Sequence, residues 1–237
     1  MAEINHKKTY KDSAVEYGNM INREDYKGNL LKAIKDISSL EGISILDLGS
    51  GTGRIERLVA PLAKNVFAMD ISLPMLQVAT DEMKKHKIKN CFHAVADHRQ
   101  IPLNSKSVDL ITSGWSVCYL ADWYRSTWQN ELMKVFSEMK RVLKSSGKII
   151  LIETQGTGFK EPHPPEHLRH YFKYLDDMGF AFRWIRTDYK FGNVTDAADL
   201  AGAFFGDEMR EKIALNKWKN LAECTGIWSG TIKEIKV

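Results

Sequence analysis

The feature that most constrains this chain is a strand-like run that ends in a glycine-rich turn and continues into a helical pattern. The run covers residues 43–48 and is mostly apolar, which is typical of a buried parallel strand. Gly49, Gly51 and Gly53 follow, and apolar residues at helical spacing begin at Ile55. A strand, a glycine turn and a helix form the first half of a nucleotide-binding α/β unit. Glycines let such a turn adopt positive φ and let a ligand approach the main chain.

Two common ligand-binding motifs of this kind match the turn poorly. A phosphate-binding P-loop ends in Gly-Lys-Ser/Thr, whereas Gly53 is followed by Arg54 and Ile55, so we reject it. A dinucleotide fingerprint places its third glycine one position later, where Arg54 stands. This mismatch weakens the case for a nicotinamide cofactor without excluding one. A plain strand-to-helix turn also remains open at this point.

Composition sets the broad class. The 237 residues, 43% hydrophobic with a net charge of +4, suit one α/β domain with a small addition. Lys and Arg are scattered and form no phosphate-tracking stripe, which argues against a nucleic-acid partner. The sequence shows no long apolar run and no signal peptide, so we expect no membrane partner. Three widely spaced cysteines favour free thiols in a reducing compartment, and we expect a cytoplasmic protein.

Four later segments read as strands of the same sheet. They cover residues 66–70, 91–95, 108–113 and 148–153. Asp70 ends the second strand, about 20 residues beyond the turn, where a carboxylate can accept hydrogen bonds from both hydroxyls of a ribose. Asp97 and His98 follow the third strand at the same ligand-binding edge.

Taken together, these segments resemble a known family. The pattern Asp47-x-Gly49-x-Gly51-x-Gly53 resembles motif I of class I S-adenosylmethionine (SAM)-dependent methyltransferases, and residues 139–153 are similar to the ubiquinone/menaquinone-type and related small-molecule methyltransferases. The resemblance implies a Rossmann-like α/β fold with a seven-stranded, mostly parallel sheet in the order 3-2-1-4-5-7-6. Strand 7 would be antiparallel, and helices would cover both faces with a helical lid.

The same resemblance implies the cofactor, S-adenosyl-L-methionine, and its product, S-adenosyl-L-homocysteine (SAH). Asp47 would lie near the ammonium of the cofactor, Asp70 at the ribose and Asp97 at the adenine amino group, with Ile71 and Met75 beside the adenine ring. The predicted cofactor-binding residues are Asp47, Gly49, Ser50, Gly51, Gly53, Asp70, Ile71, Met75, Asp97, His98, Ser113 and Tyr17.

The remaining segments predict the domain organisation. Residues 1–40 would form an N-terminal helical lid carrying Tyr10 and Tyr17, with a helix over about 23–40. Residues 41–237 would form the methyltransferase domain, with a substrate-side insertion at 154–180. Further helices are expected, and the sixth and seventh strands would close the sheet. The helices cover about 126–143, 166–178 and 207–221, another begins at Thr195, and the two strands cover 180–191 and 226–232.

The chemistry needs few diagnostic residues. A sulfonium methyl group is already electrophilic, so a protein must align the nucleophile and exclude water, and it needs a base only for a protonated acceptor. Catalytic candidates are His163, His167 and Tyr119, and Trp115, Tyr119 and Tyr124 could provide aromatic walls. Glu153 ends the predicted fifth strand, and two interpretations stay open for it: a functional carboxylate or a surface-edge carboxylate.

Two other kinds of site are disfavoured. His163, His167 and His170 recur at helical spacing, but Pro164 and Pro165 break the helix and no further ligand completes a set, so we predict no metal. Ser113-Gly114-Trp115-Ser116 replaces the Asn/Asp-Pro-Pro-aromatic motif of nucleobase amino-methyltransferases. Val117 precedes Cys118 where a cytosine C5 enzyme carries Pro-Cys, so we interpret Cys118 as structural.

We therefore predict an enzyme that transfers a methyl group to an O, N or C atom of a small molecule. The alternatives are a methyltransferase that acts on RNA or protein, and a SAM-binding regulator without catalysis. The sequence defines neither the acceptor nor the oligomeric state.

Overall fold

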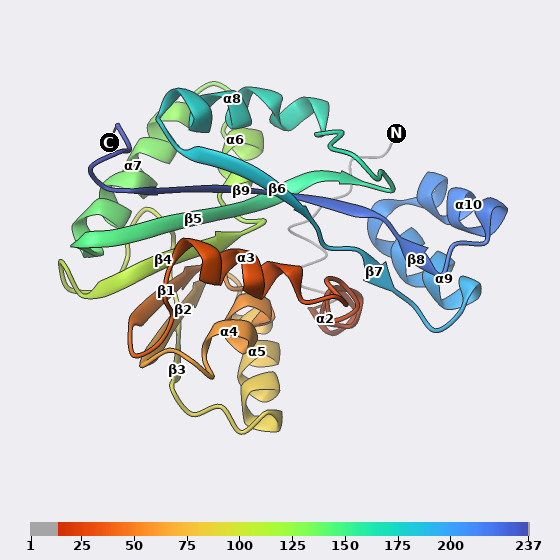
Figure 1. Cartoon of the computed structure of the whole chain (residues 1–237), viewed down its shortest axis with the longest axis horizontal. Helices are drawn as coiled ribbons and strands as arrows, with labels where there is room; N and C mark the ends of the chain where they lie inside the picture. The colour runs from red at the N-terminus through yellow and green to blue at the C-terminus, as the bar shows by residue number, and fades with distance from the viewer. Residues whose placement is uncertain (1–13, 237) are drawn as a thin grey trace.

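The computed structural model describes residues 14–236, and a seven-stranded sheet forms its centre (Figure 1). The strands lie in the order β3-β2-β1-β4-β5-β9-β6. Their bounds are Ser44–Leu48 (β1), Asn65–Asp70 (β2), Cys91–Val95 (β3), Val108–Gly114 (β4), Leu143–Thr157 (β5), Ala181–Arg186 (β6) and Glu223–Thr231 (β9).

Pairing within the sheet confirms the predicted topology. β1 pairs in parallel with β2 and β4, β2 with β3, and β4 with β5. β9 is the seventh strand predicted from residues 226–232, and it runs antiparallel between β5 and β6. The order 3-2-1-4-5-7-6 is therefore confirmed. Tyr189–Lys190 (β7) and Asn220–Leu221 (β8) form a separate two-stranded sheet that the sequence did not predict.

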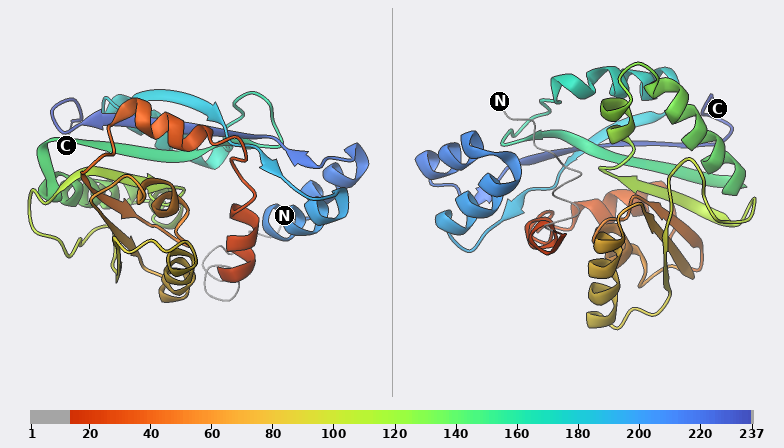
Figure 2. Two further views of the ribbon diagram at one scale, coloured as in Figure 1. Left: turned by 60° about the horizontal axis from the view of Figure 1, so that its bottom comes forward. Right: turned by 180° about the vertical axis from the view of Figure 1, so that it is seen from behind.

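Helices cover both faces of the large sheet (Figure 2). α3, α4 and α5 lie on one face, and α6, α7 and α8 lie on the other. The helices span Ala14–Ile21 (α2), Asn29–Ile37 (α3), Arg54–Val59 (α4), Leu73–Lys85 (α5), Cys118–Trp123 (α6), Trp128–Val142 (α7), Arg169–Asp177 (α8), Val194–Phe205 (α9) and Asp207–Asn216 (α10), with a 3₁₀ turn at Glu166–Leu168.

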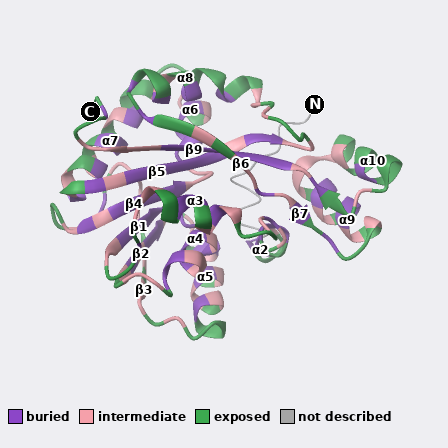
Figure 3. Cartoon of the chain, in the orientation of Figure 1, coloured by how far each residue is buried: buried purple, intermediate pink, exposed green. Residues whose placement is uncertain are grey.

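The cores follow from the apolar stripes of these helices. Leu132, Val135, Phe136 and Met139 of α7 are buried in one cluster with β4 and β5, as the spacing predicts. On the opposite face, α3 contributes Leu30, Ala33 and Ile34 to a second cluster. Figure 3 shows the resulting pattern, with the central strands buried and the outer surfaces of the helices exposed.

A third cluster builds a small lobe beyond the ends of β5 and β9. It combines α9 and α10 with the β7–β8 ribbon and with Met20 of α2. The ring of Tyr17 on α2 lies 5.5 Å from that of Phe204 on α9. At the next residue of α2, a Cβ on Gly18 would lie 3.7 Å from Thr52 Cγ2 in the glycine turn and 3.7 Å from Val78 Cγ1 in α5. α2 therefore bridges the lobe and the glycine turn.

Three predicted elements have wrong boundaries, and the two helices among them differ for identifiable reasons. The helix expected over 23–40 begins only at Asn29, because Asp25 has a φ of 55° and its carboxylate caps the N–H groups of Asn29 and Leu30. The helix expected over 207–221 ends at Asn216, since Lys217 adopts the left-handed conformation. β5 begins at Leu143 and ends at Thr157, so it is longer at both ends than the strand expected over 148–153.

The structure also bears on the predicted lid. α2 lies against the glycine turn, whereas α3 packs into the core of the large sheet. We therefore retain only α2 as a candidate lid element, and the boundaries at residues 40 and 41 remain a prediction. Tyr10 lies outside the described residues. Within residues 14–236, none of the helices has the length and apolarity that crossing a bilayer requires.

Candidate functional site

The glycine turn leaves β1 with its main chain bonded to β2. The N–H groups of Gly49 and Ser50 both donate to the carbonyl of Met69, at 2.7 and 3.0 Å. Gly49 has a φ of 69°, and a Cβ there would lie 1.8 Å from Oγ of Ser116. Gly51 has a φ of 56°, and the nearest atom to a Cβ there is Met75 Cε at 3.9 Å. A side chain at Gly51 would thus enter open space that a ligand can use.

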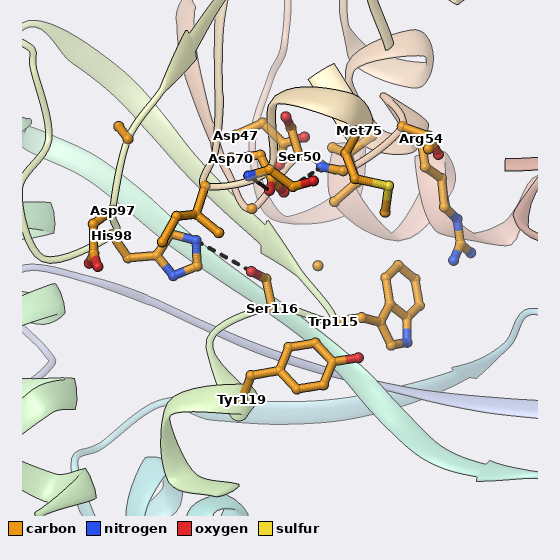
Figure 4. Close-up of a pocket in the computed structure, with 18 of the residues that line it drawn as sticks. Asp47, Ser50, Arg54, Asp70, Met75, Asp97, His98, Trp115, Ser116 and Tyr119 are labelled. Carbon is orange, nitrogen blue, oxygen red and sulfur yellow. Dashed lines mark hydrogen bonds between the residues drawn. The ribbon is translucent and has the colours of Figure 1, made fainter. Parts of the chain in front are cut away.

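That space belongs to a cavity of about 520 Å³, which we call the first cavity. It lies at the carboxyl ends of β1, β2 and β4, where ligands bind in open parallel sheets. Figure 4 shows carboxylates, His98 and aromatic rings arranged around it. Predicted cofactor residues that line it are Tyr17, Asp47, Gly49, Ser50, Gly51, Asp70, Ile71, Met75, Asp97 and His98.

Two buried polar side chains at the base of the first cavity have incomplete hydrogen bonding. Asp47 is 1% exposed; its Oδ1 accepts from the Thr112 hydroxyl at 2.8 Å. Its Oδ2 and the hydroxyl of buried Ser50 have no hydrogen-bond partner among the described residues. Burial, reinforced by the Glu56 carboxylate, holds the pKa of Asp47 well above its usual range. A cationic ligand group would supply hydrogen bonds to the unpartnered oxygens and would stabilise the ionised form of Asp47.

Asp70 is held by the main chain that surrounds it. Its Oδ2 accepts from Gly51 N–H at 2.9 Å, and its Oδ1 accepts from Ser72 N–H at 2.8 Å. Each carboxylate oxygen retains a second acceptor site. The carboxylate is therefore pre-oriented at the rim of the first cavity and can still accept from a ligand hydroxyl.

Asp97 and His98 line the far end of the first cavity. Both Asp97 oxygens accept from the Arg99 guanidinium, at 2.9 and 2.6 Å, and these bonds lower the pKa of Asp97. His98 lies with its Nε2 3.3 Å from Ser116 Oγ. Burial lowers the pKa of His98 and favours a neutral ring. Between these residues and the turn, Met75 is buried and Ile71 is exposed.

Two predicted cofactor residues do not line the first cavity. Ser113 is fully buried, and its hydroxyl donates to the carbonyl of Leu48, so it joins β4 to β1. Gly53 faces α5, where a Cβ would lie 3.2 Å from Ala79 Cβ. We therefore place neither in the proposed site, and both instead fix the shape of the turn.

Sequence reasoning missed Arg54, which lines the first cavity and is held between Trp115 and Glu24. The Arg54 guanidinium stacks 3.9 Å from the centre of the Trp115 ring and pairs with buried Glu24 at 2.8 Å. Its Nη2 has no hydrogen-bond partner among the described residues. Trp115 has a φ of 49°, which is strained for a bulky residue and turns the chain at the end of β4. Arg54 directly follows the glycine motif, and that position was its only signal.

A second cavity of about 760 Å³ adjoins the first. The two share a wall formed by Tyr17, Ile21, Arg54, Trp115 and Tyr119. All three catalytic candidates line the second cavity, as the structure places Tyr119 with His163 and His167.

The two histidines of that cavity differ from the third histidine of the same segment. His163 and His167 are both exposed, and the ring of His163 stacks on Phe159 at 4.2 Å. His170 instead packs against Trp128, with ring centres 4.8 Å apart. Within residues 14–236, no group of three His, Cys, Asp or Glu side chains is arranged to hold a metal ion.

Two buried glutamates line the second cavity. Glu153 is 1% exposed, so the surface-edge alternative is wrong. Its Oε1 accepts from Cys118 N–H and from the Tyr171 hydroxyl, both at 3.2 Å. Glu223 is 2% exposed, and its Oε1 accepts from the Thr154 hydroxyl at 2.8 Å. Burial raises the pKa of Glu153 to about 7 and that of Glu223 to about 8.

Comparison with known proteins matches residues 46–151 to a methyltransferase domain family. A demethylmenaquinone methyltransferase from Lactococcus lactis subsp. lactis is 32% identical over 127 residues, which cover 52% of this chain and 46% of the relative. A malonyl-[acyl-carrier protein] O-methyltransferase from Salmonella typhimurium is 33% identical over 106 residues, covering 45% and 37%. The chain thus spans less than half of the length of either relative.

The fold has counterparts among solved structures. A SAM-dependent methyltransferase from Aquifex aeolicus superposes with a TM-score of 0.57 at 20% identity, covering 94% of this chain and 95% of that one. The strand order, the glycine turn and the family match agree with one another. Residues 46–151 of this chain are therefore similar to a methyltransferase domain family, and the fold of the chain is similar to that of the Aquifex aeolicus enzyme.

Proposed function

We propose that this chain is a SAM-dependent methyltransferase that transfers a methyl group to an O, N or C atom of a small molecule by in-line displacement. The observation that carries the proposal is the fit between the first cavity and the methyl donor. Three side chains that line this cavity each carry an atom without a hydrogen-bond partner among the described residues: Oδ2 of Asp47, Oγ of Ser50 and Nη2 of Arg54.

These atoms match the amino-acid end of the donor. A carboxylate and a hydroxyl can accept from its ammonium, and a guanidinium can bind its carboxylate. Asp70 would accept from the ribose hydroxyls, and Asp97 would bind at the adenine edge. The volume of about 520 Å³ lies within the range of about 300–1,000 Å³ that small-molecule sites occupy. When bound, the donor supplies an electrophilic methyl group.

The second cavity is the proposed acceptor site. It adjoins the first cavity through Trp115 and Tyr119, so an acceptor can lie beside the donor with aromatic rings around it. α2 and the small lobe contribute side chains to the wall of the second cavity, and a bound acceptor packed against them would be partly shielded from water. The related enzymes are named for different acceptors, which supports a small molecule or a carrier-bound group without defining the atom.

The test is calorimetric titration of the full chain with SAH and, separately, with NAD. We expect SAH to bind and NAD to fail, and binding of NAD alone would contradict the proposal. Release of SAH from SAM is then followed in the presence of small-molecule acceptors, RNA or protein. Turnover on RNA or protein only would favour the macromolecular alternative. SAH binding without turnover on any of the three would favour a regulator.

A further inference from the structure

We propose that the acceptor of this methyltransferase carries a protonated nitrogen, which the second cavity binds through the carboxyl groups of Glu153 and Glu223. In this proposal Glu153 takes the proton of the bound ammonium and becomes a neutral acid, which leaves the nitrogen with its lone pair. The inference rests on the proposed function and adds the acceptor class to it.

The first argument is the bonding of the two carboxyl groups. Oε2 of Glu153 and Oε2 of Glu223 are buried and accept no hydrogen bond of full geometry among the described residues, although the Cys118 and Thr157 side chains interact with these carboxyl groups. Both glutamate side chains line the second cavity. A buried carboxylate that lacks partners is costly, and the cost falls when a cation or a hydrogen-bond donor reaches it. An ammonium supplies both.

The second argument is the charge around the second cavity. Four described acids line it, and two described basic side chains do so. The acids are Glu24, Asp122, Glu153 and Glu223, and the basic side chains are Arg54 and Arg125. Arg54 is already paired with Glu24 at 2.8 Å, so its charge is offset. The exposed His163 and His167 lie at the outer part of the wall. A cationic acceptor would favour ionisation of Glu153 and Glu223, whereas an anionic acceptor would gain no opposite charge from these two buried acids.

The third argument is the aromatic content of the walls. Trp115, Tyr119, Phe159, Phe204 and Phe205 all line the second cavity. Aromatic faces attract cations and also bury apolar groups. Walls of this kind, combined with carboxyl groups, suit an amine on an apolar body.

Glu153 is better placed than Glu223 to accept the proton. It follows Ile152 on β5, and the carbonyl of Ile152 accepts from Trp115 N–H at 2.7 Å. Glu153 is therefore close in the chain to a contact with the wall that the two cavities share. The bonds from Cys118 N–H and the Tyr171 hydroxyl hold one oxygen and leave the other for the acceptor. Burial brings the pKa of Glu153 to about 7, which is suitable for a general base at neutral pH.

The test measures binding rather than turnover. The full chain is saturated with SAH and titrated, by calorimetry or ligand-observed NMR, with 2-phenylethylamine, 2-phenylethanol and 3-phenylpropanoate, which share one apolar body. We expect the amine to bind about tenfold or more tightly than the alcohol, with the carboxylate weakest. Glu153→Gln and Glu223→Gln should each reduce amine affinity by about tenfold and leave alcohol affinity nearly unchanged.

Glu138→Gln is the matched control, because Glu138 lies on α7 and pairs with Arg141 at 2.7 Å outside both cavities. It should not change any of the three affinities. If Glu153→Gln does not fold, the affinity ranking of the three probes and the effect of Glu223→Gln on amine affinity test the inference.

Three results would overturn the inference: alcohol or carboxylate binding as tightly as the amine, amine affinity unchanged by both substitutions, or no amine binding up to its solubility limit. Each leaves the proposed function intact as long as SAH binds. Loss of SAH binding by the wild-type chain would instead contradict the proposed function itself.

Discussion

Glu153→Gln should stabilise this protein at neutral and basic pH. The wild-type carboxyl group is 1% exposed, and burial raises its pKa from 4.5 to about 7. The amide has nearly the same shape, and its oxygen can still accept from Cys118 N–H and the Tyr171 hydroxyl. The substitution therefore removes the ionisation of this group and keeps its contacts.

The magnitude follows from linkage between protonation and folding. Below the unfolded-state pKa both states carry the proton, and Glu153 contributes no pH dependence. Between pH 4.5 and about 7 the unfolded chain releases the proton while the folded protein retains it, so the free energy of unfolding falls as pH rises. Since one pH unit corresponds to about 1.4 kcal/mol, the full loss is about 3 kcal/mol.

The assay is guanidinium chloride unfolding of both proteins at several pH values between about 5 and 8. The difference between the two free energies isolates Glu153, because every other ionisable side chain is the same in the two proteins. We expect it to be smallest at the acidic end and to reach about 3 kcal/mol in favour of the variant at the basic end.

Glu138→Gln provides a control of opposite sign. The Arg141 guanidinium and the Ile101 N–H lower the pKa of Glu138, so its stabilising contribution is present above pH 4.5 and is lost on acidification. That variant should be less stable than wild type at pH 8. A Glu153→Gln protein that is equally stable or less stable at pH 8 would refute the argument that Glu153 is a buried, underpaired acid.

Three further substitutions test the first cavity. Arg54→Met should weaken binding of SAH by about tenfold and leave binding of 5′-methylthioadenosine, which lacks the amino-acid end, unchanged by calorimetry; equal losses for both ligands would contradict the assignment. Gly51→Ala should cost about 1–2 kcal/mol of stability from its positive φ and weaken SAH binding, because the methyl group enters the cavity; undiminished affinity would mean that the turn faces away from the ligand. Asp70→Ala should weaken SAH by more than about tenfold and also lower the melting temperature, since two N–H groups lose their acceptor; unchanged affinity would refute the ribose assignment.

The sequence predicted the sheet because its signal is local and repeated. Each parallel strand is a short apolar run, and the run at 43–48 meets its glycine turn directly. The order of the strands came from the family resemblance, and the pairing of β9 between β5 and β6 agrees with it. The placement of Asp47, Asp70 and Asp97 around one cavity follows from their positions at the ends of three strands.

The acceptor side could not be predicted in the same way. Glu153 is buried by Cys118 and Tyr171, which belong to other segments of the chain, so no local pattern reveals its environment. Glu223 begins β9, and its partner Thr154 lies 69 positions earlier. The small lobe depends on the two-residue strands β7 and β8, which are too short to leave a periodic signal.

Ser113 shows a different limit of prediction from sequence position. Its position at the end of the fourth strand suggested a ligand contact, but the alternation of a strand turns its hydroxyl toward Leu48. Position along a strand thus indicated the edge of the sheet without giving the direction of the side chain.

The most direct test of the central claim is a crystal structure of the full chain grown with SAH. We predict SAH density along the first cavity, with its ribose at Asp70, its adenine at Asp97 and its amino-acid end between Asp47 and Arg54. Density for SAH at any other place in the molecule, with the space beside Gly51 filled by protein or solvent alone, would contradict it.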